Sequence, residues 1–414
     1  MISTKFYYRC SDCGLEYNNQ EIRYLCPKCQ SQNRANQPPK GVLKVIYNYQ
    51  EIRKTGSTAL NEMLKQTDYL SLLPIEHLSS LPPLRVGKTP VYNITKNLKI
   101  KGTNLFIKDE SQNPTFSYKD RASAVVSAFA KENGITSIAA ASTGNAGSSL
   151  AGICASQMQK AIVFVPAKAP LAKLTQILMY GAQLIPVDGT YDDAFDLSIA
   201  ASNEFGWFNR NTAFNPLTIE GKKTAAFEIV EQFPDKLPDY IFVPVGDGVI
   251  ISGLYKGFED LLELGLIDKM PILVAVQAYG SNNLVQNLYS DNFVAKTSKT
   301  IADSISVDIP RNFYMASQYI KKYQGMVSEV SDDDIIQASD ILSKHTGIFA
   351  EPAAAATLAG FLEFKKQNLI SELSNCLLLS TGSGLKDLSA VQNILHFPQP
   401  ISLNLVGVKN ILNL

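Results

Sequence analysis

The hydrophobic residues of this chain lie mainly in short runs, and segments of helical periodicity separate these runs. The runs are rich in Ala, Val, Ile and Leu, which is typical of strands buried on both faces of a sheet. We predict strands at 137–142, 161–166, 182–188, 240–245, 272–277 and 376–380. The repetition of strand, short loop and helix predicts an α/β protein with parallel sheets that helices cover on both sides.

The first forty residues do not follow this pattern, and the stretch N-R-A-N-Q-P-P-K-G after them resembles a linker. A chain of 414 residues is also too long for one small core. We therefore expect a small module at 1–40, a large α/β domain formed by 41–106 and 225–414, and a small α/β domain at 107–224.

The composition excludes several classes of partner. Hydrophobic residues make up 45% of the chain, and 38 basic residues balance 38 acidic ones. No net positive charge is available to attract nucleic acid or an anionic membrane. The sequence contains no apolar run of membrane-spanning length, and its N-terminus lacks the apolar core of a signal peptide. These features predict a cytoplasmic protein with a small-molecule ligand.

Four of the six cysteines form two C-x-x-C pairs, Cys10 with Cys13 and Cys26 with Cys29. Four thiolates at this spacing can surround Zn²⁺ tetrahedrally, and a module this short would gain its folding free energy from the metal. A zinc-ribbon-like site is our prediction, and a redox pair or a metal-free remnant is the alternative.

The stretch S-Q-N-P-T-F-S-Y-K-D-R places Lys119 at the expected start of a helix that Asn113, Thr115 or Ser117 would cap. A cation in the first turn opposes the helix dipole, so the neutral amine is favoured. A neutral lysine is a nucleophile that can react with a carbonyl group. The alternative is an ordinary surface lysine.

Three loops rich in hydroxyl groups and glycine follow predicted strands. They are Ser142–Gly147, Gly246–Ile250 and Ser380–Asp387. Backbone N–H groups at the start of a helix can bind a carboxylate or a phosphate there. The second loop matches neither a P-loop nor a dinucleotide fingerprint, because the required lysine and the last glycine are missing. An ordinary capped helix is the alternative for the first loop.

Together these segments resemble threonine synthase and its relatives among the fold type II pyridoxal 5′-phosphate enzymes, which share the fold of the tryptophan synthase β subunit. The family motif N-P-T-G-S-F-K-D-R is similar to N-P-T-F-S-Y-K-D-R here, and S-T-G-N-T is similar to S-T-G-N-A. Further matches are E-G-K-K-T-A-A-F-E (220–228), V-P-V-G-D-G-V-I-I-S-G-L-Y-K-G-F (243–258), E-P-A-A-A-A (351–356) and T-G-S-G-L-K-D (381–387).

The resemblance implies a role for each matching residue. Lys119 would bind the cofactor covalently and then transfer protons at the substrate carbons. Asn145 would contact the phenolic oxygen of the cofactor, Thr381 its pyridine nitrogen, and Gly246, Asp247, Gly248, Val249 and Ile250 its phosphate. Ser142, Thr143, Ser117 and Lys108 would bind the substrate.

The chain also departs from the family motifs on the substrate side. Relatives read N-P-x-R before E-G-x-K-T, with an arginine for the substrate phosphate, but this chain has Thr218 there. Phe116 stands where glycine is usual, and Ser383 stands where histidine is frequent. The resemblance implies a homodimeric lyase that converts O-phosphohomoserine and water into threonine and phosphate. β-Replacement or elimination on another amino acid such as phosphoserine, and a binding protein that has lost catalysis, are the alternatives.

Overall fold

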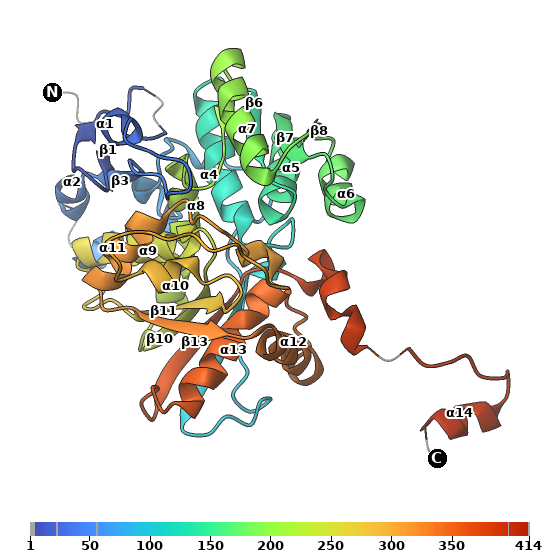
Figure 1. The fold of residues 1–414 in the computed structure, drawn as a ribbon. Coiled ribbons are helices and arrows are strands. Elements are labelled where there is room, and N and C mark those ends of the chain that lie inside the picture. The colour runs from blue at the N-terminus through green and yellow to red at the C-terminus, as the bar shows by residue number, and fades with distance from the viewer. Residues whose placement is uncertain (1–4, 22–23, 55–56, 396, 413–414) are drawn as a thin grey trace.

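The computed structural model of the chain describes residues 5–21, 24–54, 57–395 and 397–412, and the strands of these residues form three sheets (Figure 1). The N-terminal sheet has the order β2-β1-β3 and is antiparallel. It comprises β1 (Phe6–Cys10), β2 (Glu16–Tyr17) and β3 (Leu43–Tyr47). Strand β3 therefore extends the N-terminal unit past residue 40, the boundary expected from the sequence.

The largest sheet has six strands in the order β12-β11-β10-β13-β5-β4. All neighbours are parallel except β4, which pairs antiparallel with β5 at one edge. The strands are β4 (Val91–Asn93), β5 (Thr103–Asp109), β10 (Tyr240–Pro244), β11 (Ile272–Ala278), β12 (Met326–Val330) and β13 (Ser374–Ser380). The expected domain boundary at 106 falls inside β5, which pairs with β13 along its whole length.

The third sheet is fully parallel and has the order β8-β7-β6-β9. Its strands are β6 (Ser137–Ala141), β7 (Lys160–Pro166), β8 (Gln183–Val187) and β9 (Phe208–Asn209). The prediction of parallel strands in two α/β sheets is confirmed, and each of the six predicted strands coincides with an observed one to within two residues at either end.

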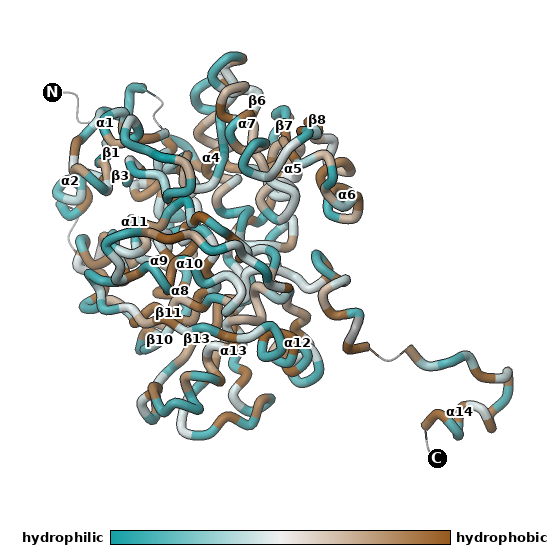
Figure 2. The backbone as a smooth tube through the Cα atoms, viewed as in Figure 1, coloured by the Kyte–Doolittle hydropathy of each residue, from teal (hydrophilic) through white to brown (hydrophobic). Residues whose placement is uncertain are grey.

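Side chains alternate between two cores along the central strands, as the pleat of a strand requires. In β10, Ile241 and Val243 join one core, whereas Phe242 joins the core on the opposite face. The same division separates Ala140 from Ala139 in β6. Figure 2 shows these strands as apolar segments inside the body. Burial on both faces explains why their sequence runs are continuously hydrophobic.

Helices connect the strands and cover both faces of the two parallel sheets (Figure 1). Helix α13 packs against β10 and β13, while α8 packs against α9 and α4. Ser331 caps α12, since its hydroxyl accepts a hydrogen bond from the Asp334 N–H at 3.1 Å. The helices are α1 (Pro27–Gln30), α2 (Tyr49–Arg53), α3 (Ser57–Gln66), α4 (Lys119–Glu132), α5 (Asn145–Ser156), α6 (Leu171–Met179), α7 (Tyr191–Phe205), α8 (Leu217–Gln232), α9 (Val249–Glu263), α10 (Asn283–Asn287), α11 (Phe313–Lys322), α12 (Asp332–Thr346), α13 (Pro352–Lys366) and α14 (Leu405–Leu412).

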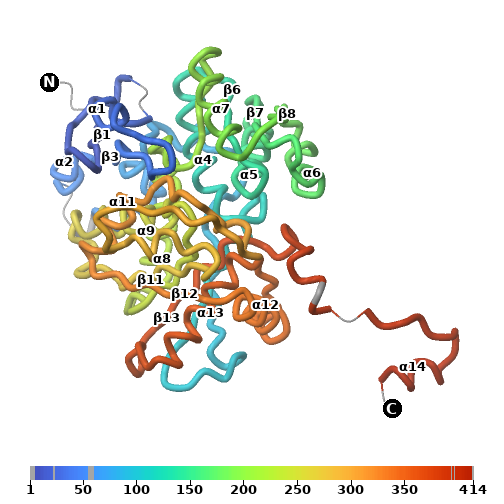
Figure 3. The backbone as a smooth tube through the Cα atoms, in the orientation of Figure 1, coloured from blue at the N-terminus to red at the C-terminus, as the bar shows by residue number. Residues whose placement is uncertain are grey.

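After residue 394 the chain leaves the body and ends in α14, which buries none of its side chains (Figure 3). None of the helices in the described part of the chain has the length and apolarity needed to cross a bilayer. The loops at the carboxyl ends of β6 and β10 face each other across the junction of the two parallel sheets, and this junction positions the candidate site.

Candidate active site

A cavity of about 560 Å³ lies between the two parallel sheets and collects residues from three of the predicted segments. Lys119 lines it from the start of α4, Ser142–Asn145 line it from the loop after β6, and Gly246–Ile250 line it from the loop after β10. In open α/β proteins, ligands bind at this place, outside the carboxyl ends of parallel strands.

Lys119 is the first residue of α4, as the sequence indicated. The expected cap is wrong, however, because Tyr118 occupies the cap position and no side chain accepts a hydrogen bond there. Thr115 instead donates to Asp120, from its backbone N–H at 2.7 Å and its hydroxyl at 2.5 Å. Burial lowers the pKa of Lys119, and the positive charge of Arg210 lowers it further. Both effects favour the neutral, nucleophilic amine.

The loop after β6 ends at the first residue of α5, so the N-terminus of that helix opens into the cavity. Ser142 accepts a hydrogen bond from the Gly144 N–H at 3.3 Å, which fixes the turn. A Cβ on Gly144 would meet no atom within 4 Å, so the backbone of this loop is open to the cavity. Free N–H groups and two hydroxyls at a helix N-terminus form a suitable site for a carboxylate.

Asn145 is held by residues from the large sheet. Its side-chain amide donates to both carboxylate oxygens of Glu351, at 3.0 and 2.9 Å, and to the Ser304 hydroxyl at 3.2 Å. Glu351 is buried, and burial raises the pKa of its carboxyl group. The motif E-P-A-A-A-A places Glu351 in a segment that matches the family, but the sequence does not reveal its hydrogen bonds to Asn145.

The loop after β10 needs its glycines for close packing. Gly248 has φ +84°, and a Cβ there would come within 2.9 Å of the Ala316 side chain. A Cβ on Gly246 would lie 3.0 Å from the backbone of Ile305. Because Gly248 caps α9, the first N–H groups of that helix, from Val249 and Ile250, have no partner inside the helix and can bind an anion.

These features fit pyridoxal 5′-phosphate. A phosphate requires a helix N-terminus with close backbone approach, an aldehyde requires a nucleophilic amine, and a ring oxygen requires an amide donor. The glycine loop and Lys119 supply the first two of these groups around one cavity, and Asn145, whose amide donates to Glu351, lines the same cavity. Its size is in the range usual for small-molecule sites.

Ser117 and Thr381, which were predicted to contact the ligands, lie at the turn that precedes Lys119. The Thr381 carbonyl accepts a hydrogen bond from the Tyr118 N–H at 2.8 Å, and Ser117 forms a β-bridge with Gly382. Both side chains are buried, and the Ser117 hydroxyl has no hydrogen-bond partner. Neither residue lines the cavity described above. The predicted contacts of Thr381 with the cofactor and of Ser117 with the substrate stay predictions.

Lys108 is placed elsewhere, which contradicts its predicted contact with the substrate. Its ammonium donates to Glu228 at 2.8 Å, to Gln232 at 2.9 Å and to the Thr89 carbonyl at 3.0 Å. An ammonium has three protons, so no donor is left for a ligand. The side chain is fully buried and does not line the cavity. Its partner is 120 positions away in the sequence, so the motif around Lys108 could not reveal the pair.

Sequence reasoning missed two cations beside the cavity. Arg210 follows β9 and lines the cavity next to Lys119, and Lys222 on α8 donates to the hydroxyl of Thr212, another lining residue, at 3.2 Å. Arg210 lies outside the quoted motifs, and Lys222 occupies the variable position of E-G-x-K-T. Their significance depends on burial, which the sequence alone does not give.

The four cysteines of the N-terminal module converge as the spacing predicted. Their sulfur atoms all lie within 4.8 Å of one another, and none forms a disulfide. The Sγ atoms of Cys10 and Cys29 are 3.8 Å apart, and those of Cys13 and Cys26 are 3.7 Å apart. A tetrahedron with Zn–S bonds of ~2.3 Å has edges of about 3.8 Å.

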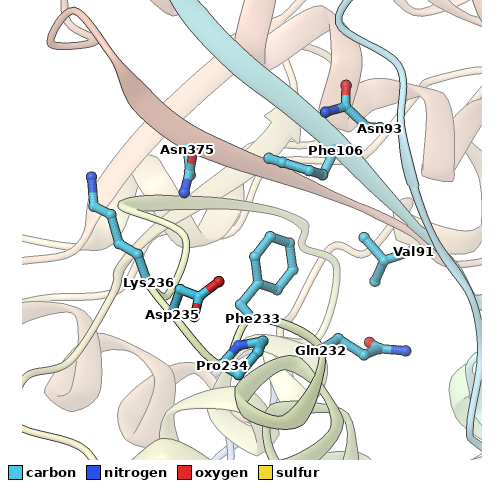
Figure 4. Close-up of a pocket in the computed structure, with 9 residues that line it drawn as sticks. All are labelled: Val91, Asn93, Phe106, Gln232, Phe233, Pro234, Asp235, Lys236 and Asn375. Atoms are coloured by element: carbon cyan, nitrogen blue, oxygen red, sulfur yellow. The ribbon is translucent and has the colours of Figure 1, made fainter.

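A second cavity of about 470 Å³ lies at the amino ends of the large-sheet strands, away from Lys119 (Figure 4). Phe233 occupies the middle of the labelled residues, edge-on to Phe106 with ring centroids 5.1 Å apart. Asp235 and Lys236 are the charged residues in its lining. We assign no chemistry to this cavity.

The chain belongs to the family described as pyridoxal-phosphate dependent enzyme, whose sequence model matches residues 83–382. Within this family it is similar to threonine synthases. It is 35% identical to threonine synthase from Methanocaldococcus jannaschii and 32% identical to that from Methanosarcina acetivorans, with 98% of each chain covered in both comparisons. Both matches include the N-terminal module.

Solved structures of the same fold give a consistent result. Threonine deaminase isoform 2 from Solanum lycopersicum matches with a TM-score of 0.66 and 21% identity, covering 80% of this chain and 92% of its own. Maize serine racemase matches with a TM-score of 0.65 and 23% identity, covering 75% and 92%. These identities establish the fold type II architecture and not the substrate.

Proposed function

We propose that this protein is a threonine synthase, which converts O-phosphohomoserine and water into threonine and phosphate. One observation carries the proposal. In a chain that threonine synthases match from end to end, Lys119, Asn145 and the glycine turn line a single cavity. Serine racemases and threonine deaminases share the fold at lower identity.

Each residue of the site then has a role that follows from its position. The N–H groups at the start of α9 and the Gly246–Gly248 turn hold the cofactor phosphate, and Asn145 orients its ring. When bound, pyridoxal phosphate supplies an electron-withdrawing ring that stabilises negative charge on the substrate carbons. Ser142 and Thr143, at the start of α5, hold the substrate carboxylate.

Lys119 transfers protons during the reaction. Its lowered pKa favours the neutral amine, which can accept a proton, and the protonated form can return a proton to a neighbouring carbon. Loss of phosphate breaks the bond between Cγ and oxygen, and the water that is added supplies the hydroxyl at Cβ and one proton. The electrons of the broken bond leave with the phosphate.

The test is a substrate panel on the pyridoxal-phosphate-loaded enzyme. We expect release of phosphate and formation of threonine from O-phosphohomoserine, and no comparable phosphate release from O-phosphoserine. Lys119→Ala should abolish turnover, whereas Lys269→Met, at an exposed lysine outside the site, should retain it. Faster release from O-phosphoserine would identify the β-replacement alternative. Bound cofactor without turnover of any substrate would identify a binding protein.

We further propose that the four cysteines bind one structural Zn²⁺. Sulfur spacings of 3.7 and 3.8 Å support a tetrahedral site, and the absence of disulfides in the described residues leaves all four thiols available. Metal analysis of the purified protein should give one zinc per chain, and Cys13→Ser should lower that content. Full zinc content in this variant would exclude the site.

The homodimer and the cytoplasmic location stay predictions that the family resemblance supports. Sedimentation of the loaded enzyme should give twice the mass of the 45.3 kDa chain. Fractionation of cells should place the protein with soluble enzymes. A monomer at micromolar concentration would contradict the first prediction, and recovery with membranes would contradict the second.

A further inference from the structure

Six cationic side chains are fully buried among the described residues, and four of them are paired with acids. Lys108 lies 2.8 Å from Glu228, Arg121 lies 2.7 Å from Glu110, and Lys223 lies 2.7 Å from Asp260, which also pairs with Lys256. The other two, Arg210 and Lys222, form no ion pair with any described residue. Burial of an unpaired charge costs several kcal/mol, so this exception indicates a missing partner.

Of the two unpaired cations, Arg210 lines the cavity and Lys222 lies in the layer behind it. Arg210 is only 1% exposed. Its Nε donates to the Ser123 hydroxyl at 3.2 Å, and its Nη2 has no hydrogen-bond partner. Lys222 is buried completely, and its hydrogen bond to Thr212 joins it to the same lining. A guanidinium with a free nitrogen beside an ammonium is a typical arrangement for binding a phosphate.

Nearby acids among the described residues form no ion pair with either cation. Asp247 uses one carboxylate oxygen to accept a hydrogen bond from the Arg311 N–H at 3.0 Å, and Asp120 accepts both of its bonds from Thr115. Burial lowers the pKa of Arg210 to about 10, and burial together with Lys119 and Arg210 lowers the pKa of Lys222. A bound anion would reverse both effects.

We propose that Arg210 and Thr212 form the subsite for the phosphate group of the substrate, with Lys222 behind them as a positioning residue that donates to Thr212, and this assignment rests on the proposed function. The glycine turn at the start of α9 already offers N–H donors for the phosphate of the cofactor. The second phosphate therefore belongs on the opposite wall, where Arg210 follows β9 in the small sheet.

The position of Lys222 agrees with this assignment. It lies one helical turn after Thr218 on α8, so the two residues share one face of the helix. Thr218 is fully buried and donates its hydroxyl proton to the Asn215 carbonyl at 2.8 Å, so it has no proton left for a ligand. The positive charge on this face of α8 is therefore supplied by Lys222.

The test compares Arg210→Gln, Lys222→Gln and Thr212→Val with the parent, all as loaded enzymes. We expect kcat/KM for O-phosphohomoserine to fall about 10- to 100-fold for each lost charge. Binding of inorganic phosphate, measured by ³¹P NMR, should weaken in parallel. Binding of the cofactor should stay within about twofold, since its phosphate is assigned to the glycine turn at the start of α9. Exchange of the α-proton of 2-aminobutyrate, which carries no phosphate, should fall less than kcat/KM, because it registers only the effect of Arg210 on the pKa of Lys119.

Three results would overturn the assignment. Weaker binding of the cofactor in the variants would place the cofactor phosphate at these cations, and an equal fall in α-proton exchange and in kcat/KM would mean that they act only through Lys119. Unchanged phosphate binding would show that they bind no phosphate.

Lys256→Met, at a buried cation with an acid partner, is the control for loss of buried charge. Arg210→Lys and Lys222→Arg keep the charge if a neutral variant does not fold. If the parent binds phosphate but does not turn over O-phosphohomoserine, the proposed function fails while the phosphate measurements still test the subsite.

Discussion

Asn145 and Glu351 are 206 positions apart in the sequence, yet the Asn145 amide donates to both carboxylate oxygens, at 2.9 and 3.0 Å. Asn145 begins a helix of the small sheet, and Glu351 precedes a helix of the large one. The pair therefore joins the two sheets at the active-site cavity. It also holds the amide that we assign to the cofactor in a fixed orientation.

Glu351→Gln tests the electrostatics of this pair. Burial raises the pKa of Glu351 above its ordinary value of 4.5, so the native state retains a proton that the unfolded state releases. The parent therefore loses stability as pH rises from 4.5 to the raised pKa, and glutamine, which does not ionise, avoids this loss. In urea unfolding of the cofactor-free protein, the free energy of unfolding of the variant should rise relative to that of the parent between pH 4.5 and 7.5. A difference that does not depend on pH would contradict the raised pKa.

Lys108→Met separates a structural role from the substrate role first inferred from the sequence. Loss of one member of a buried pair leaves Glu228 with Arg121 alone, so we expect the free energy of unfolding to fall by about 3 kcal/mol. KM for O-phosphohomoserine should not change, because all three protons of the Lys108 ammonium are used inside the protein. Lys269→Met, at an exposed lysine, should leave both quantities unchanged. A raised KM with normal stability would restore the substrate role.

The case of Lys108 shows which parts of the molecule the sequence could predict. Continuous apolar runs located six strands, because burial on both faces leaves a local signal. Strand β5 was not predicted, because Thr103 and Asn104 begin it and Lys108 and Asp109 end it. The first three of these polar side chains find partners that are distant in the sequence. Motif residues located Lys119, Asn145 and the glycine turn. Arg210 and Lys222 could not be found, because their importance lies in the acids that they lack, and this depends on the tertiary structure.

Phe116 has φ +69° in the turn that precedes Lys119, a conformation that disfavours residues with a Cβ. Its N–H donates to the Asn113 carbonyl at 2.8 Å and its carbonyl accepts from the Ser383 N–H at 3.1 Å, so the turn cannot relax easily. Because the side chain is 47% exposed, truncation to Ala or Gly removes little packing. We expect Phe116→Gly to be more stable than Phe116→Ala by ~1 kcal/mol.

The control is Leu197, an exposed position inside α7, where the order of the two substitutions should reverse. Thermal unfolding of the four variants under one buffer condition measures both differences. If Ala is the more stable residue at both positions, the turn before Lys119 carries no backbone strain.

Glu259 on α9 anchors the N-terminal module to the large sheet, and this contact should depend on pH. Although burial opposes ionisation, Lys44 of β3 and Lys322 of α11 lower the pKa of Glu259 from 4.5 to about 2. A lowered pKa adds stability that is complete above pH 4.5 and is lost as pH falls toward 2. For this side chain, which is 9% exposed, the lowering of the pKa corresponds to about 3 kcal/mol of stability at neutral pH.

Glu259→Gln should therefore lower the free energy of unfolding by up to about that amount at pH 7, and by clearly less at pH 3, where the parent has begun to lose the same contribution. Chemical denaturation at the two pH values measures this difference, with Glu263→Gln as the control because Glu263 is half-exposed on the same helix. An equal loss at pH 7 and pH 3 would mean that Glu259 acts through packing and not through its charge.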